Sequence, residues 1–303
     1  MATLRDIGIA FGFTVLSVLG VIVLLAALGP DWARYAPATC TATRCFCEFP
    51  RTGALVLQPA NSWSSYGYAF VGLLMIVLSR GAAWRSGFHR DAAAFFGVTA
   101  ILVGLGSVLL HATLSLWGQF FDVTGMYFTS GFMLVSALTR WRDLSERRAV
   151  TLYIVLLAVL LALLYAVPEV RRWLFAVVLI AALVAELAFA RPQRPGIRVS
   201  YYLIGIVLKA VAFTIWNLDQ RGIVCAPHSL LQGHAAWHLL GATSLWFTFL
   251  YYRSERPQPN TSPGQPGTSP AQDRLARLID RVKCPAARLK CLAAGVRCGN
   301  RGT

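Results

Sequence analysis

Charged residues are scarce in this sequence. They make up 14% of its 303 residues, and only 13 are acidic, whereas 56% of the residues are hydrophobic. A soluble domain of this size needs a more polar surface, so the composition excludes that class. The sequence also lacks a long internal repeat and any nucleic-acid-binding motif. Its net charge of +15 therefore needs another explanation.

The hydrophobic residues are concentrated in long runs. About 20 apolar residues in a helix match the thickness of the bilayer core. Backbone polar groups must be satisfied inside lipid, so such runs predict helices. The expected fold class is an all-α polytopic membrane protein, with a seven-helix transmembrane bundle and one extra N-terminal transmembrane helix. The predicted spans are residues 7–29, 63–79, 92–116, 120–139, 150–167, 173–190, 201–218 and 233–252.

The first run lacks the features of a cleaved signal peptide, because it is too long and ends in a poor cleavage site. We therefore assign residues 1–30 to an extra transmembrane helix, 31–60 to an extracytoplasmic connection and 61–252 to a seven-transmembrane core. Residues 253–303 begin with a Pro/Gly/Ser/Thr-rich linker that is predicted to be disordered. A basic amphipathic helix follows, which either lies on the anionic inner leaflet or is solvated.

The distribution of arginine predicts the topology and explains the net charge. The positive-inside rule assigns the arginine-rich loops to the cytoplasm. Both termini are then cytoplasmic, as an even number of spans requires, and no nucleic-acid partner is needed. The loops after the second, fourth and sixth spans carry Arg80, Arg85, Arg90, Arg140, Arg142, Arg147, Arg148, Arg191, Arg194 and Arg198. The opposite loops carry only Arg34, Arg44, Arg51, Arg171, Arg172 and Arg221.

Several polar residues interrupt the predicted spans near their extracytoplasmic ends. Ser107 and His111 lie four residues apart and so share a helix face. Asp122 falls in the first turn of the next predicted span, and His234 and His238 form another i, i+4 pair. Zn²⁺ favours imidazole, and a catalytic zinc has three protein ligands and one open position. The three histidines therefore predict a zinc site. The remaining histidines are predicted to be solvated: His89 and His228.

Each polar side chain also has a structural interpretation when it is taken alone. Asp122 could complement a helix dipole, and Ser107 could bond its own helix backbone. Facing a zinc ion, however, the two supply groups to activate water and stabilise an oxyanion. Lys209 lies about ten residues into the seventh span, where a free ammonium is costly. We expect it to extend inward or to pair with Glu186, without a catalytic role.

The spacing of these residues resembles that of an intramembrane hydrolase superfamily. It contains the alkaline ceramidases, the GPI-anchor lipid remodelling proteins and the progestin/adipoQ-type receptors. The shared pattern is S-x3-H at Ser107/His111, an Asp eleven residues later, and H-x3-H at His234/His238. WNLDQ at 216–220, Cys225 and HAAWHLL are similar to the last two helices of alkaline ceramidases. The CxCE motif at 45–48 and Asn61 resemble their N-terminal segment. The resemblance covers roughly residues 45–252.

The resemblance implies a zinc-dependent intramembrane lipid amidase. Its substrate would be a ceramide-like sphingolipid, cleaved at the N-acyl bond to a sphingoid base and a fatty acid. His111, His234 and His238 would hold Zn²⁺, Asp122 would move the proton, and Ser107 would donate to the oxyanion. The active site would face the extracytoplasmic side of the bilayer. Two alternatives remain: a lipid ester hydrolase of the same superfamily, or a receptor-like membrane protein with a structural zinc.

The resemblance carries over less well for calcium. In alkaline ceramidases calcium is bound by a D-W-C-E-x-N loop and a later Glu, whereas only Cys47 and Glu48 of that set are kept here. Gln58 stands in place of the later Glu, so Ca²⁺ is in doubt. Two further residues, Asn61 and Asp219, join Glu48 as either supports of the metal site or remnants of a calcium site.

Cysteine usage leaves several pairings open. Cys40, Cys45, Cys47 and Cys225 are all predicted to be extracytoplasmic, where disulfides persist. Four cysteines allow three pairings. The corresponding pair in alkaline ceramidases implies a Cys47–Cys225 bond, which leaves Cys40 and Cys45 to pair or stay free. Three cysteines near the C-terminus are predicted to be cytoplasmic and reduced: Cys284, Cys291 and Cys298.

Overall fold

The computed structural model describes residues 2–41, 45–194 and 196–257. These residues belong to one unit, Met1–Pro257. The predicted amphipathic helix and the cysteines at 284, 291 and 298 therefore lie outside the described residues.

Helices dominate the described chain, which contains no strand beyond one isolated bridge between Pro37 and Ser115. The helices are α1 (Leu4–Leu28), α2 (Pro59–Ser64), α3 (Tyr66–Arg80), α4 (Arg90–Thr113), α5 (Leu116–Arg142), α6 (Glu146–Ala166), α7 (Arg171–Val184), α8 (Val199–Gln220) and α9 (Gly233–Arg253). A π-helical stretch, Ala185–Ala190, continues α7.

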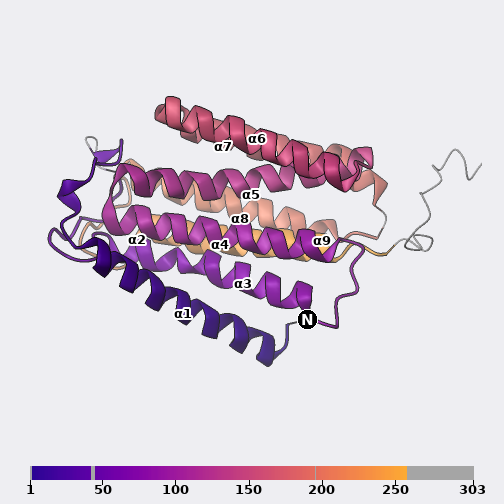
Figure 1. Ribbon diagram of the computed structural model, residues 1–303, viewed down its shortest axis with the longest axis horizontal. Coiled ribbons are helices and arrows are strands. Elements are labelled where there is room, and N and C mark those ends of the chain that lie inside the picture. The colour runs from indigo at the N-terminus through magenta and orange to yellow at the C-terminus, as the bar shows by residue number, and fades with distance from the viewer. Residues whose placement is uncertain (1, 42–44, 195, 258–303) are drawn as a thin grey trace, which may run out of the picture. The chain divides into compact units, whose positions relative to one another are not determined.

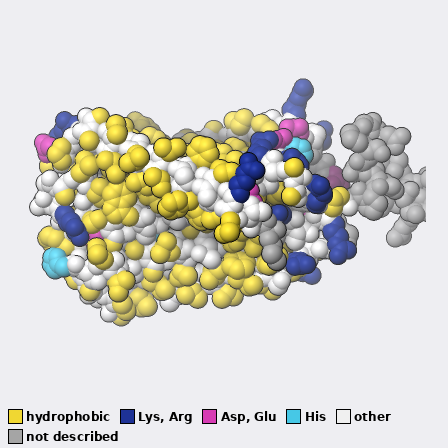
Figure 2. All heavy atoms as spheres, turned by 90° about the horizontal axis from the view of Figure 1, so that it is seen from below, with side chains coloured by type: hydrophobic (Ala, Val, Ile, Leu, Met, Phe, Trp, Pro, Cys, Tyr) yellow, Lys and Arg dark blue, Asp and Glu magenta, His cyan; other side chains and the backbone are white. Residues whose placement is uncertain are grey.

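Six helical segments in the described chain are long and apolar enough to cross a membrane. They are α1, α4, α6, α8, the α2–α3 segment Pro59–Arg80 and the α7 segment Pro168–Gln193. Hydrophobic side chains cover most of the visible face between the two ends, and most visible Lys and Arg side chains gather toward one end (Figure 2). The prediction of an all-α membrane protein is confirmed. The number of spans stays a prediction, because α5 and α9 are long but more polar.

The long helices lie side by side in a bundle (Figure 1). α4 packs against both α3 and α5, and α9 packs against α8 and α3. α1 packs on α3, while α6 and α7 pack on α5. Aromatic residues of three inner helices, such as Phe96, Phe132 and Phe249, fill the core between them. α4 and α9 thus meet in the interior, and residues on their facing sides can contact each other.

The link between α4 and α5 is shorter than the sequence predicts. Leu114 adopts a left-handed conformation with φ of 48° and ends α4, because helical geometry cannot continue through it. The Ser115 hydroxyl then accepts a hydrogen bond from the Gly118 N–H and caps α5. α5 consequently begins at Leu116, which puts Asp122 in its second turn. The prediction of a first-turn position is wrong.

A buried ionic network holds the end of the bundle opposite the histidines. The Arg140 guanidinium pairs with Glu186 and, at 3.3 Å, with Glu255. The Tyr251 hydroxyl donates to Glu186 over 2.6 Å. Glu186 is therefore already engaged, so of the two alternatives predicted for Lys209, the pairing with Glu186 is wrong.

The Lys209 ammonium lies instead against aromatic rings of the neighbouring helices. Its Nζ is 4.7 Å from the centre of the Trp237 ring and 6.0 Å from that of Tyr68. A Cβ at Gly241, which follows His238 by three residues in α9, would stand 3.2 Å from the Lys209 Nζ, so the Lys209 side chain lies within about one turn of His238. A cation over an aromatic face is stabilised by the ring quadrupole, which offsets part of the desolvation cost.

Candidate active site and metal centre

Three histidines converge in the interior near one end of the bundle, here called the histidine end. His111 comes from the last turn of α4, and His234 and His238 from the first two turns of α9. All three are buried, with exposed fractions of 1%, 5% and 2%. One nitrogen from each ring lies within 4.8 Å of the other two. The sequence-predicted ligands are therefore brought together by two helices that are far apart in the chain.

Hydrogen bonds on the far side of two rings determine where their protons lie. The carbonyl of Glu48 can only accept, so the Gln58 Nε2 at 2.7 Å must donate to it. The Gln58 Oε1 is then the atom 2.9 Å from His111 Nδ1, and His111 Nδ1 must carry a proton. His238 Nδ1 likewise donates to the Asn61 carbonyl at 3.0 Å. Both rings when neutral therefore present a bare Nε2 to the interior.

This donor set fits zinc. The bare Nε2 of His111 is 3.1 Å from His234 Nε2. Nitrogens that share a tetrahedral zinc at about 2.0–2.1 Å must come within a few ångströms of one another. His234 Nδ1 has no hydrogen-bond partner among the described residues. That leaves its ring orientation without an outer anchor, unlike those of the other two histidines.

Segment 45–61, called here the connecting segment, contacts the histidine rings from outside α4 and α9. The ring of Phe46 lies 4.5 Å from that of His111 and 4.3 Å from that of His234, measured between centroids. A few residues beyond this segment, the hydroxyls of Ser64 and Ser65 lie 3.0 and 3.1 Å from His238 Nδ1. The histidines are therefore enclosed by apolar and polar contacts that their own helices do not supply.

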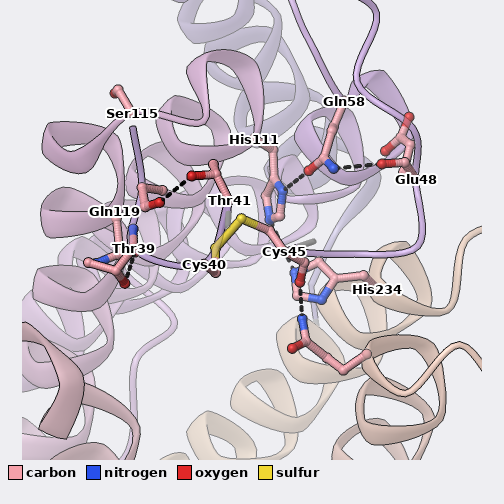
Figure 3. The surroundings of a disulfide bond; sticks show 12 residues. Thr39, Cys40, Thr41, Cys45, Glu48, Gln58, His111, Ser115, Gln119 and His234 are labelled. Atoms are coloured by element: carbon pink, nitrogen blue, oxygen red, sulfur yellow. Dashed lines mark hydrogen bonds between the residues drawn. A yellow bond between two sulfur atoms is a disulfide. The ribbon is translucent and has the colours of Figure 1, made fainter. Parts of the chain in front are cut away.

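Two disulfides restrain this region. Cys47 bonds Cys225, which lies in the loop between α8 and α9, and Cys40 bonds Cys45. The second bond lies beside His111 and His234 (Figure 3). Gln220 at the end of α8 donates from its Nε2 to the carbonyl of Cys45. The connecting segment is thus fixed to α8 and to the loop that leads from α8 to α9.

Ser107 lies next to the three rings. Its Oγ is 3.2 Å from His238 Nε2, and the Asp122 carboxylate lies near the same hydroxyl. Gly106 allows this arrangement, because a Cβ there would overlap the Phe121 carbonyl and stand 2.9 Å from the Asp122 nitrogen. α4 and α5 therefore touch backbone to backbone where Ser107 and Asp122 meet. Arg171 at the start of α7 interacts electrostatically with the same carboxylate.

The carboxylates suggested as calcium remnants are occupied by backbone donors. Glu48 accepts from the Ala60 N–H at 2.8 Å and the Asn61 N–H at 2.9 Å, which caps α2. Asp219 accepts from the N–H groups of Cys47 and His234, each at 3.2 Å. Burial raises the pKa of the Glu48 carboxyl, and its two backbone hydrogen bonds oppose that shift.

Among the described residues, these contacts leave the Glu48 and Asp219 carboxylates bound to backbone N–H groups. Within the described chain, the three histidines form a group of side chains close enough together to bind one metal ion. Calcium needs six to eight oxygen ligands, and the carboxylates of Glu48 and Asp219 act here as anchors for helix starts. Asn61 contributes its carbonyl to His238, while its side-chain amide has no partner among the described residues.

Sequence reasoning missed two residues of the site. Gln58 was noted only as a departure from a calcium motif, although it bonds His111 directly. The ring of Phe46 packs against two histidines, and nothing in the sequence around a single aromatic residue in a loop predicts such a contact. The position of Gln58 directly before Pro59, which opens α2, could have indicated a fixed side chain.

Comparison with known families agrees with this geometry. The profile of the Ceramidase family matches residues 40–263, which include all three histidines, Ser107 and Asp122. The chain belongs to the ceramidase family. Among curated proteins no match was found. The family implies a hydrolase acting on the amide bond of ceramide, with a ceramide-like membrane lipid as its substrate. The ceramidase match leaves α1 outside its limits.

Proposed function

We propose that this protein is a zinc-dependent intramembrane amidase. It hydrolyses the N-acyl bond of ceramide-like sphingolipids and yields a sphingoid base and a fatty acid. One observation carries the proposal: three buried histidine nitrogens converge beside Ser107 in a chain of the ceramidase family.

His111, His234 and His238 are the zinc ligands in this proposal. A zinc ion held there would polarise a water molecule and the amide carbonyl of the substrate. The cluster in the described chain offers three ligands, which leaves one position of a tetrahedral site open. A closed structural site would use a fourth protein ligand, so this ligand count favours the enzyme over a receptor-like protein.

Asp122 and Ser107 perform the proton transfer and the oxyanion stabilisation. Asp122 takes a proton from the attacking water and returns it to the leaving amine, as general base and then general acid. The Ser107 hydroxyl donates to the carbonyl oxygen while negative charge develops there. If the lone pair of His238 Nε2 were held by the metal ion, the single hydroxyl proton of Ser107 would be free to be donated to the carbonyl oxygen. The nearness of the Ser107 hydroxyl to the Asp122 carboxylate supports their joint action.

The arginine distribution supports a topology for this activity. Both termini are cytoplasmic, and the histidine end faces the extracytoplasmic side. Residues 61–252 form the hydrolase core, α1 is an additional membrane anchor, and the segment after 252 is cytoplasmic. The acyl chain of the substrate lies among apolar side chains in the interior of the bundle.

Lipid mass spectrometry tests the proposal. Purified protein is incubated with ceramides, and separately with phospholipids and other lipid esters in the same membranes. Release of sphingoid base and fatty acid from ceramide alone supports the amidase. Release of fatty acid only from the esters would replace it with the lipid ester hydrolase.

A further inference from the structure

Gln58 is the residue through which the connecting segment hydrogen-bonds the ring of His111. Its side chain is 1% exposed, and both ends of its amide are used. Nε2 donates to the Glu48 carbonyl over 2.7 Å, and Oε1 accepts from His111 Nδ1 over 2.9 Å. Figure 3 shows the amide lying between the two partners. The Glu48 carbonyl can only accept a hydrogen bond, so the Gln58 amide must donate to it and accept from His111.

An amide suits both contacts at once. A carboxylate could accept from His111 Nδ1 but would face the Glu48 carbonyl with a second acceptor. An apolar side chain would leave the buried carbonyl and the buried Nδ1–H without partners, which is costly in the interior. Gln58 therefore selects the proton position of His111 that directs its bare Nε2 toward the other two histidines.

The partners of Gln58 are themselves fixed. The Gln58 N–H donates to the His111 carbonyl over 3.0 Å, so main chain and side chain bind the same residue of α4. The neighbouring Leu57 N–H donates to the Ala112 carbonyl over 3.0 Å. Glu48 is held by its carboxylate at the start of α2, and its neighbour Cys47 by the bond to Cys225. The position of the Glu48 carbonyl, which accepts from Gln58, is therefore fixed by its neighbours.

We propose that Gln58 is a positioning residue of the metal centre, which holds His111 in its ligand orientation through the Glu48 carbonyl. The proposal rests on the three histidines being the metal site, as proposed above. Outer partners of histidine ligands raise metal affinity by orienting the ring, and their removal typically costs about 10–100-fold.

Zinc affinity of the purified full-length protein tests this, with Zn²⁺ competed against a chelating indicator. Gln58→Met keeps the length of the side chain and removes both hydrogen bonds, so zinc should bind about 10–100-fold more weakly. Gln58→Glu keeps the acceptor for His111 Nδ1–H and loses the donor to Glu48, so its affinity should fall between those of Gln58→Met and the wild type. The visible absorption spectrum of the Co²⁺ form should change in the same order, because it reports the ligand geometry.

Gln119→Leu is the matched control. Gln119 is also a buried amide at the histidine end, but its Oε1 binds the N–H and hydroxyl of Thr39 and contacts no histidine. Its loss should leave zinc affinity and the Co²⁺ spectrum unchanged, even if the thermal stability falls. This separates loss of a buried amide from loss of the bond to His111.

The outcomes are distinct. Wild-type zinc affinity and an unchanged Co²⁺ spectrum in folded Gln58→Met would overturn the role of Gln58. If Gln58→Met does not fold, Gln58→Glu decides: several-fold weaker zinc binding than the wild type supports the role, and equal binding refutes it. A wild-type protein that binds neither Zn²⁺ nor Co²⁺ would instead refute the metal centre itself.

Discussion

The Cys47–Cys225 bond should stabilise the fold much more than the Cys40–Cys45 bond. Its cysteines are 178 positions apart in the chain, whereas Cys40 and Cys45 are only 5 apart. The entropy lost by the unfolded chain grows with the length of the closed loop. The chain-entropy relation gives about 5 kcal/mol for the long loop and about 2 kcal/mol for the short one. Removing the long-range bond should therefore cost about 3 kcal/mol more.

The assay compares the double variants Cys47→Ser/Cys225→Ser and Cys40→Ser/Cys45→Ser in detergent micelles. At about 2–4 °C per kcal/mol for a domain of this size, the first should lower Tm by about 10–20 °C and the second by about 4–8 °C. Peptide mapping of the wild-type protein under non-reducing conditions first establishes both bonds. The first variant should also bind zinc more weakly, because it releases the segment that holds His111 and His238.

An equal loss of Tm in the two variants would refute the loop-length argument. A larger loss from the Cys40–Cys45 variant would show that local packing beside the histidines dominates instead. Zinc affinity that stays at the wild-type level in both variants would show that the connecting segment keeps its place without either disulfide.

Three further outcomes follow from the same contacts. A zinc-selective chelator should abolish turnover and a calcium-selective chelator should leave it unchanged, as measured by product release, because Glu48 is occupied by backbone donors; activation by added Ca²⁺ would contradict this. Gly106→Ala should destabilise the protein by about 1–3 kcal/mol and lower turnover, because its Cβ would separate α4 from α5 at Asp122; wild-type stability in thermal unfolding would show that the helices can shift. Arg140→Ala should cost about 3–5 kcal/mol by leaving Glu186 buried without its cation, with turnover per folded molecule retained; a specific loss of turnover would connect that network to the site.

The sequence was most informative where chemistry and helical spacing coincide. His234 and His238 are four residues apart, which fixes them on one face of α9, and their placement in apolar spans indicated a buried role. Their meeting with His111 followed from the resemblance and from the common membrane level of the three. Hydropathy identified the helices because long apolar runs have few other stable forms.

Contacts between distant segments could not be predicted. The relation of Gln58 to His111 depends on segment 57–58 pairing with the end of α4, and no local pattern encodes that pairing. The predicted position of Asp122 within its helix was wrong by one turn, because Ser115 caps α5 earlier in the chain than the apolar run suggested. The alternative that paired Lys209 with Glu186 was wrong because Arg140 was assigned to a loop, although α5 extends to Arg142 and carries Arg140.

The most direct test of the central claim is mass spectrometry of ceramide incubated with zinc-loaded wild-type protein and with zinc-loaded Asp122→Asn. The zinc content of both proteins is measured in the same samples. The account predicts about one zinc per chain in each, with sphingoid base and fatty acid released by the wild type only. Intact ceramide with the zinc-loaded wild type, or equal release by Asp122→Asn, would contradict it.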